Sequence, residues 1–361
     1  MSKFHPLSVA QVVAETRDAI LVSFEVPAHL RDTFRYRPGQ HLTLRTDIDG
    51  EDVRRSYSVC AAVQDEHLRI AIKRIHGGLF SNWANDHLKP GMRLDVMPPM
   101  GNFGAAHTPG AGRPSHHYLA FAAGSGITPV LSIIKTTLLS EPDSQFTLFY
   151  GNRSSSAVIF RGELGDLKDR FMERLNLVYV MSREQQEIDL LNGRLTQERC
   201  RKLLQGWVDL DRIDTAYICG PEGMMHAADA ALQELGFPKA RIRIELFATS
   251  IPRHDRVVHD KPAPGQESCE VTLIMDGRRQ TFLMEKNVES VLDAGLRQGM
   301  DMRYSCKGGV CSTCRCKVIE GQVDMDVNYA LEDYEIARGF VLSCQSYPAS
   351  DTLTIDFDQD T

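Results

Sequence analysis

The chain has 361 residues and a net charge of −7, with 42% hydrophobic and 25% charged residues. This length suits two or three domains that each bury a core, and the composition excludes a disordered chain or a small disulfide-stapled scaffold. No apolar run approaches the roughly 20 residues that span a bilayer, no signal peptide opens the chain and no basic stripe indicates nucleic acid, so we expect a cytoplasmic protein without membrane or nucleic-acid partners.

Short strand-like runs fill the first hundred residues. Residues 42–44, 57–59 and 68–72 are brief apolar runs bounded by Pro, Gly, Asp and Arg, which is typical of a small β-sandwich or β-barrel. A turn-rich stretch over 107–114 follows. We expect a first, antiparallel β domain over residues 1–110.

One strand of this domain carries the sequence Arg55-Ser56-Tyr57-Ser58. Alternate residues of a strand share a face, so Arg55 and Tyr57 can present a cation for phosphate and an aromatic face for a flat ring. The serine hydroxyls can reach a ring nitrogen.

A glycine-rich turn follows this strand region. Gly77-Gly78-Leu-Phe-Ser81 leads into a predicted helix over 82–88. The free N–H groups at the start of a helix bind phosphate oxygens, which favours a phosphate-bearing cofactor here.

Strands and helices alternate in the next part of the chain. Val130, Ile134 and Leu138 recur every four residues on one helix face, between strand-like runs. The alternation predicts a parallel α/β sheet over residues 115–250. Its predicted strands cover residues 118–123, 146–150, 177–181, 215–219 and 242–247.

Two turns of this sheet are candidate nucleotide-binding segments. Gly124-Ser-Gly126-Ile-Thr128-Pro129 follows a strand and opens a helix, as a dinucleotide phosphate loop does, although Pro129 replaces the final glycine of the usual pattern. Cys219-Gly220 ends a later strand at the edge where open α/β sheets bind ligands. A plain strand-to-helix turn is the alternative interpretation of the second segment.

A polar stretch over 251–267 reads as a linker, and a third domain follows over 268–361. Two strand-like runs over 271–275 and 280–284 flank Asp276-Gly277, which is a hairpin signal. Residues 290–298 predict a short helix capped by Ser290.

Four of the nine cysteines lie in one pattern. Cys306, Cys311 and Cys314 are spaced C-x4-C-x2-C, and Cys344 follows after 29 residues. This is the plant-type spacing for a [2Fe–2S] cluster, and the two glycines after Cys306 let the backbone approach it. Structural zinc usually needs a second C-x2-C unit, and disulfides are disfavoured in a reducing compartment. Cys316 breaks the spacing, so we expect a buried thiol there.

The charge of the chain is concentrated in this last part. From Cys269 onward there are 16 Asp and Glu against 9 Lys and Arg, which leaves 32 against 32 in the residues before it. The excess can steer a basic partner, or it can serve only as a solvated acidic surface.

Together these segments resemble the ferredoxin–NADP reductase superfamily in the arrangement with a C-terminal plant-type ferredoxin domain. The resemblance covers the whole chain and is closest to the reductase components of multicomponent di-iron monooxygenases. It implies an FAD-binding β-barrel, an NAD(P)-binding α/β domain and an α+β ferredoxin domain of the β-grasp type. The runs that carry it are 37–44, 122–129, 190–195 and 306–316.

The resemblance also implies roles for single residues. Arg55 would hold the flavin phosphates, Tyr57 would stack on the flavin ring and Ser58 would lie near flavin N5. Cys219 would approach the nicotinamide, and Phe247 would cover the flavin unless it is a core residue. The remaining implied cofactor contacts are Ser56, Gly78 and Ser81 for FAD, and Gly124, Gly126 and Thr128 for the dinucleotide.

The segment Ser182-Arg183-Glu184 is similar to the one that plant-type reductases use for the 2′-phosphate of NADP. Arg183, Arg194 and, more weakly, Arg153 are the candidates for that phosphate, or else surface arginines in salt bridges. The resemblance therefore implies NADPH as the coenzyme, with NADH as the alternative.

We expect an oxidoreductase that passes electrons from NADPH through FAD and a [2Fe–2S] cluster to a di-iron oxygenase. A flavin is needed between the two end groups because nicotinamide delivers electrons in pairs and an iron–sulfur centre accepts them singly. A reductase for another oxygenase or a desaturase would share every motif. A non-catalytic ferredoxin-type carrier is the alternative from a different class.

Overall fold

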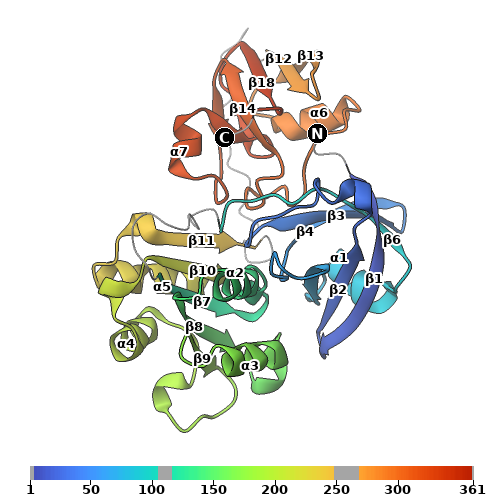
Figure 1. The fold of residues 1–361 in the computed structure, drawn as a ribbon. Helices are drawn as coiled ribbons and strands as arrows, with labels where there is room; N and C mark the ends of the chain where they lie inside the picture. Colours follow the sequence, from blue (N-terminus) through green and yellow to red (C-terminus); the bar gives the residue numbers. More distant parts are fainter. Residues whose placement is uncertain (1–3, 105–115, 248–267, 360–361) are drawn as a thin grey trace. The chain divides into compact units, whose positions relative to one another are not determined.

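The computed structural model describes residues 4–104, 116–247 and 268–359 (Figure 1). These residues form two compact units, one over residues 4–247 and one over residues 268–359. In these described ranges no helix is both long and apolar enough to cross a membrane. The predicted linker over 251–267 and the turn-rich stretch over 107–114 lie outside the described residues. The proposed domain boundaries therefore stay predictions.

The first unit begins with a six-stranded antiparallel sheet in the order β4-β3-β6-β1-β2-β5. A bridge between Val59, directly after β4, and Ile70 in β5 joins the two edges of the sheet, so the sheet closes into a barrel around an apolar core. The expectation of a barrel is confirmed. Its strands are β1 (His5–Thr16), β2 (Ala19–Glu25), β3 (His41–Ile48), β4 (Glu51–Ser58), β5 (Leu68–Lys73) and β6 (Arg93–Val96).

Helix α1 (Leu79–His87) packs Phe80 and Ala84 into the barrel core. The predicted start at Asn82 was wrong by three residues. Gly78 is the N-cap, and Ser81 lies inside the first turn, where its buried hydroxyl bonds back to the preceding loop.

The second sheet is parallel, with strand order β11-β10-β7-β8-β9, and the five predicted strands are all confirmed. The chain runs from β7 outward to β8 and β9 and then returns to β10 on the other side. The carboxyl ends of β7 and β10 therefore meet at a topological switch point, the usual place for a ligand. The strands are β7 (His117–Ala123), β8 (Gln145–Asn152), β9 (Leu175–Met181), β10 (Thr215–Gly220) and β11 (Ile242–Leu246). The helices are α2 (Ile127–Ser140), α3 (Arg161–Arg170), α4 (Gln197–Trp207) and α5 (Glu222–Glu234).

The second unit holds a five-stranded sheet in the order β13-β12-β18-β14-β16 and the pair β15-β17. The predicted hairpin and helix are confirmed: Asp276 and Gly277 both have positive φ, as a type I′ turn requires, and Ser290 Oγ accepts the N–H of Asp293. The elements are β12 (Ser268–Met275), β13 (Arg278–Glu285), α6 (Val291–Arg297), β14 (Arg315–Glu320), β15 (Val323–Met325), α7 (Asp333–Ala337), β16 (Phe340–Leu342), β17 (Ser346–Pro348) and β18 (Thr352–Asp356).

Short 3-10 helices connect several of these elements. They are η1 (Ala28–Leu30), η2 (Gly124–Gly126), η3 (Ser155–Ala157), η4 (Asp189–Leu191), η5 (Leu210–Arg212) and η6 (Lys239–Arg241).

Candidate functional site

Strand β4 presents the predicted cation and aromatic ring. Arg55 is exposed, and Tyr57 is half-buried with its ring centroid 5.6 Å from that of Phe80 in α1. Burial raises the pKa of the Tyr57 hydroxyl, and the Arg55 guanidinium opposes that rise, so the two side chains are electrostatic neighbours. Ser56 lies on the other side of the strand, with its hydroxyl 3.2 Å from that of Thr43.

Ser58 brings the barrel into contact with the parallel sheet. Its buried hydroxyl donates a hydrogen bond of 3.3 Å to Oε2 of Glu245 in β11. Burial raises the pKa of the Glu245 carboxyl to about 8, and the bond from Ser58 only partly opposes this. A carboxyl with such a pKa can hold or release a proton near neutral pH.

Cys219 belongs to the same group. It is fully buried at the end of β10, directly paired with Glu245 in the neighbouring strand. Burial, and then the Glu245 carboxylate, raise the pKa of the Cys219 thiol, so it stays protonated and uncharged. Ser58 and Cys219, which the resemblance places at flavin N5 and at the nicotinamide as the candidate catalytic residues, therefore lie around one carboxylate.

Glu245 was missed from the sequence. An acidic residue in the run 242–247 reads as the solvent-facing position of an alternating edge strand. The signal that could have found it is its place at the carboxyl end of the last parallel strand, where ligands bind.

The turn before α1 is tight, so its backbone lies close to the side chain of Ser81. Gly77 has a φ of 72°, which favours glycine, and a Cβ at Gly78 would lie 2.5 Å from Ser81 Oγ. Ser81 Oγ in turn accepts the N–H of Ile75 at 3.2 Å. The start of α1 is thus a compact loop with backbone N–H groups, as phosphate binding needs.

The loop after β7 is held by close contacts with its neighbours. A Cβ at Gly126 would lie 2.1 Å from the carbonyl oxygen of Cys219, so only glycine lets the two strand ends meet. Tyr150 donates a hydrogen bond of 2.9 Å to the Gly124 carbonyl, and Thr128 donates one of 3.0 Å to Ser125.

Lys73, at the end of β5, also reaches this loop. A Cβ at Gly124 would lie 3.4 Å from its Nζ. Burial, and then the nearby Arg153 cation, lower the pKa of Lys73. A lysine beside a glycine loop, with a second cation near enough to repel it, is an arrangement suited to an anion. Sequence reasoning missed Lys73 because only the fold brings the barrel to this loop.

The arginine candidates lie on adjoining loops beyond β8 and β9. Arg183 N–H donates to the Arg153 carbonyl at 2.8 Å, and Gly193, next to Arg194, bonds to Met181 at the end of β9. All three arginine side chains are exposed. The Glu184 carboxylate beside them accepts both the N–H and the hydroxyl of Ser155, at 2.8 and 3.0 Å. Phe247 is half-buried against the core of the parallel sheet.

Four of the six cysteines in the second unit form two hydrogen-bonded pairs. Cys306 pairs with Cys311, and Cys314 pairs with Cys344; each pair lowers the pKa of one member, Cys311 and Cys344. Three of these side chains are buried and Cys306 is partly exposed. Two pairs of thiols match two tetrahedral irons, each with two protein ligands.

The backbone around these thiols also fits a cluster. Lys307, Gly309 and Ser312 have φ values of 51°, 75° and 48°, so the loop coils tightly. The Gly308 N–H donates to Cys306 Sγ at 3.3 Å, and a Cβ at Gly309 would lie 2.8 Å from the Val327 carbonyl oxygen. Backbone N–H groups aimed at sulfur are what a [2Fe–2S] centre needs.

Other metal sites fit less well. In the parts of the chain that the structure describes, no three His, Cys, Asp or Glu side chains are placed to hold a single metal ion. Cys316 is buried, with its thiol 3.7 Å from the Val341 carbonyl, and so lies in the core of the sheet. Cys60, Cys200 and Cys269 are likewise free and buried.

Three family models match the chain in order. They are the oxidoreductase FAD-binding domain over residues 6–104, the oxidoreductase NAD-binding domain over residues 121–230 and the 2Fe-2S iron-sulfur cluster binding domain over residues 273–349.

Full-length relatives share the arrangement. The chain is 48% identical to one subunit of the 1,2-phenylacetyl-CoA epoxidase of Escherichia coli (strain K12), over 99% of both chains. It is 35% identical to the ferredoxin reductase component of 3-ketosteroid-9-alpha-monooxygenase of Rhodococcus rhodochrous, over 97% of this chain and 96% of the relative. The solved structure of phthalate dioxygenase reductase covers 98% of both chains, with a TM-score of 0.58 and 21% identity, and shows the same fold.

Proposed function

Because the chain belongs to the family of flavin- and iron–sulfur-containing reductase components of multicomponent oxygenases, we propose that it supplies the electrons for epoxidation of phenylacetyl-CoA, using NADPH as donor. The observation that carries this proposal is the 48% identity over 99% of the chain with the 1,2-phenylacetyl-CoA epoxidase component. The chain is an NAD(P)H-dependent oxidoreductase with FAD-binding and [2Fe–2S]-binding domains.

FAD is the group that can take a hydride and release its electrons singly. We propose that Tyr57 supports its ring and that Arg55 binds its phosphates. The N–H groups around Gly78 and Ser81 bind the pyrophosphate. The tight turn at Gly78 and the neighbouring Arg55 and Tyr57 support these roles.

The nicotinamide nucleotide would bind at the ends of β7 and β10. Gly124, Gly126 and Thr128 form the loop for its pyrophosphate, and Lys73 supplies a positive charge there. Arg183 and Arg194 on the outer loops would bind the 2′-phosphate of NADPH. The Glu184 carboxylate would disfavour that phosphate, but its bonds to Ser155 hold it against the β8 loop.

Ser58, Cys219 and Glu245 would flank the site of hydride transfer. Glu245 holds a proton at neutral pH, and Ser58 Oγ lies within hydrogen-bonding distance of its Oε2. The pair can therefore keep a proton beside the flavin edge, while the neutral Cys219 thiol adds no charge to oppose hydride transfer. Phe247 would cover the flavin ring.

The two thiol pairs would ligate one iron each, Cys306 with Cys311 and Cys314 with Cys344. All nine cysteines are free, which suits a reducing compartment such as the cytoplasm. The acidic excess from Cys269 onward favours docking to a basic surface of the oxygenase.

Coupled turnover tests the proposal. Purified reductase, the oxygenase components and phenylacetyl-CoA are mixed with NADPH, and epoxide formation is followed. We expect product only when the reductase is present. Rapid flavin bleaching by NADPH without product, together with product from another oxygenase, would refute the assigned partner. Absence of bleaching would refute the reductase itself in favour of an electron carrier.

A further inference from the structure

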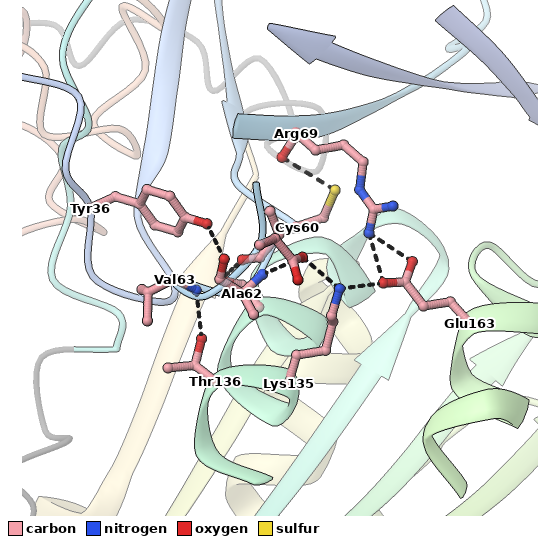
Figure 2. A network of polar contacts seen from close by, with 11 residues as sticks. Tyr36, Cys60, Ala62, Val63, Arg69, Lys135, Thr136 and Glu163 are labelled. Atoms are coloured by element: carbon pink, nitrogen blue, oxygen red, sulfur yellow. Dashed lines mark hydrogen bonds and ion pairs between the residues drawn. The ribbon is translucent and has the colours of Figure 1, made fainter. Parts of the chain in front are cut away.

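A network of polar contacts joins the FAD-binding domain to the NAD-binding domain (Figure 2). Beyond β4 the chain continues into the loop 59–66, which lies against one face of α2. Ser132 donates to the Ala61 carbonyl at 2.6 Å, and Thr136 accepts the Val63 N–H at 3.2 Å. These two α2 residues are four apart and so share a helix face.

Four charged side chains extend this contact, and negative and positive charges alternate along them. Lys135 Nζ lies 2.6 Å from both Asp65 and Glu163, and Arg69 donates to both carboxylate oxygens of Glu163 at 2.7 and 2.8 Å. Asp65 and Arg69 belong to the FAD-binding domain, and Lys135 and Glu163 to the NAD-binding domain. The four-residue ion network therefore crosses the domain boundary twice.

The ion network is partly shielded from water. The side chains of Lys135, Arg69 and Glu163 are 12, 22 and 23% exposed, and that of Asp65 is 30% exposed. Glu163 lies between two cations, so removing its charge leaves both of them without their shared partner. Two more contacts cross the same boundary: Glu15 accepts the Phe160 N–H at 2.6 Å, and Arg69 lies over the Phe160 ring.

The connected elements are the ones that carry the cofactor-binding segments. The loop 59–66 continues directly from the strand with Arg55, Tyr57 and Ser58, and α2 begins directly after the loop with Gly124 and Gly126. A shift of α2 against this loop would change the separation between flavin and nicotinamide. Hydride transfer depends steeply on that separation.

We propose that the four-residue ion network sets the distance between flavin and nicotinamide, with Glu163 as its central positioning residue. The inference rests on the proposed NADPH-to-flavin hydride transfer. Glu163 and Lys135 both belong to the NAD-binding domain, so loss of the network shifts α2 and the Gly124–Gly126 loop together against the loop 59–66. The coenzyme-binding loop keeps its own shape, and the network therefore governs the rate of the transfer rather than the affinity for the coenzyme.

The test compares Glu163→Gln with Asp95→Asn in FAD-loaded, full-length protein. Asp95 forms a similarly half-buried ion pair with Arg45, at 2.8 Å, but both partners lie within the FAD-binding domain. Stopped-flow absorbance gives the limiting rate of flavin reduction and the Kd for NADPH. NADPH deuterated at C4 and the long-wavelength flavin–nicotinamide absorbance report the transfer geometry.

A displacement of about 1 Å can cost a hundredfold in rate. We therefore expect saturating NADPH to reduce the bound flavin about tenfold more slowly, or slower still, in E163Q than in the wild type. The Kd should stay within about threefold, the isotope effect should rise and the charge-transfer absorbance should weaken, while D95N behaves as wild type. Glu163→Asp, which keeps the charge, should recover part of the rate.

Wild-type reduction rates in E163Q, or equal slowing in E163Q and D95N, would overturn the inference. If E163Q does not fold, Asp65→Asn replaces it, because it removes the Asp65–Lys135 crossing of the domain boundary and keeps the Arg69–Glu163 pair. It should slow flavin reduction by a smaller factor with the Kd for NADPH unchanged, and a wild-type rate in D65N would overturn the inference. Failure of the proposed function would look different, because NADPH would then not bleach the flavin bound to the wild-type protein at all.

Discussion

Gly126→Ala tests the close approach of the β7 and β10 ends. The added Cβ would lie 2.1 Å from the Cys219 carbonyl oxygen and 2.5 Å from its carbon, both backbone atoms that cannot rotate away. Ordinary contact begins at 3.4 Å, so the start of α2 or the end of β10 must move by 3.4 − 2.1 Å, or about 1.3 Å. This shift falls in the loop that we assign to the nucleotide pyrophosphate.

The cost follows from overpacking against a rigid backbone. We expect about 3 kcal/mol of lost stability, the upper end of the usual range, and hence a fall in Tm of about 6 to 12 °C for a unit of this size. The displaced loop should also raise the Kd for NADPH at least about tenfold, since its N–H groups no longer converge on the phosphates.

Thermal unfolding and an NADPH titration of the FAD-loaded protein measure both effects. Gly206→Ala in α4 is the matched control, because a Cβ there meets nothing within 4 Å. It should stabilise the protein slightly or leave it unchanged, since alanine favours a helix by about 1 kcal/mol over glycine. A G126A protein with wild-type Tm and wild-type Kd would refute the steric argument.

Three further predictions concern single side chains. The raised pKa of Glu245 means that the folded protein holds a proton that the unfolded chain has released, so its stability should fall as pH rises from about 4.5 to about 8. Glu245→Gln should remove about 2 kcal/mol of that decline. Urea unfolding of both proteins between pH 4.5 and pH 8 measures it, and an identical pH profile would contradict the raised pKa of Glu245. Cys311→Ser should lose the cluster absorbance and cytochrome c reduction while keeping NADPH-dependent ferricyanide reduction through the flavin; equal loss of both activities would argue against separate modules. Arg183→Ala should raise KM for NADPH by about tenfold or more through a lost charge-assisted bond and leave NADH unaffected, whereas parallel changes for both coenzymes would exclude a 2′-phosphate contact.

Patterns with a local physical cause were predictable from the sequence. The inner parallel strands are nearly continuous apolar runs because both faces of their sheet are buried. The cysteine spacing reflects the geometry of one loop. Strand β1 (His5–Thr16) was not predicted, because its partly exposed outer half lacks a regular apolar alternation.

Contacts between distant segments could not be predicted in this way. Ser58 and Glu245 are 187 positions apart, and Arg69 and Glu163 are 94 apart. From the sequence alone, Glu245 and Glu163 are each expected to be solvated surface charges. Only the packing of the barrel on the parallel sheet gives it a partner and, for Glu245, an altered pKa.

In the proposed function, the strand order of the parallel sheet places coenzyme selection and hydride transfer on different sides of β7. The arginine-bearing turns follow β8 and β9, on one side of β7, whereas Ser58, Cys219 and Glu245 gather at β10 and β11 on the other side. Exchanging residues 182–194 for the matching turn of another reductase should therefore change the preferred coenzyme and leave the maximal turnover intact. Under this proposal, a change of coenzyme preference alters one rim of the domain and leaves the residues proposed for hydride transfer in place.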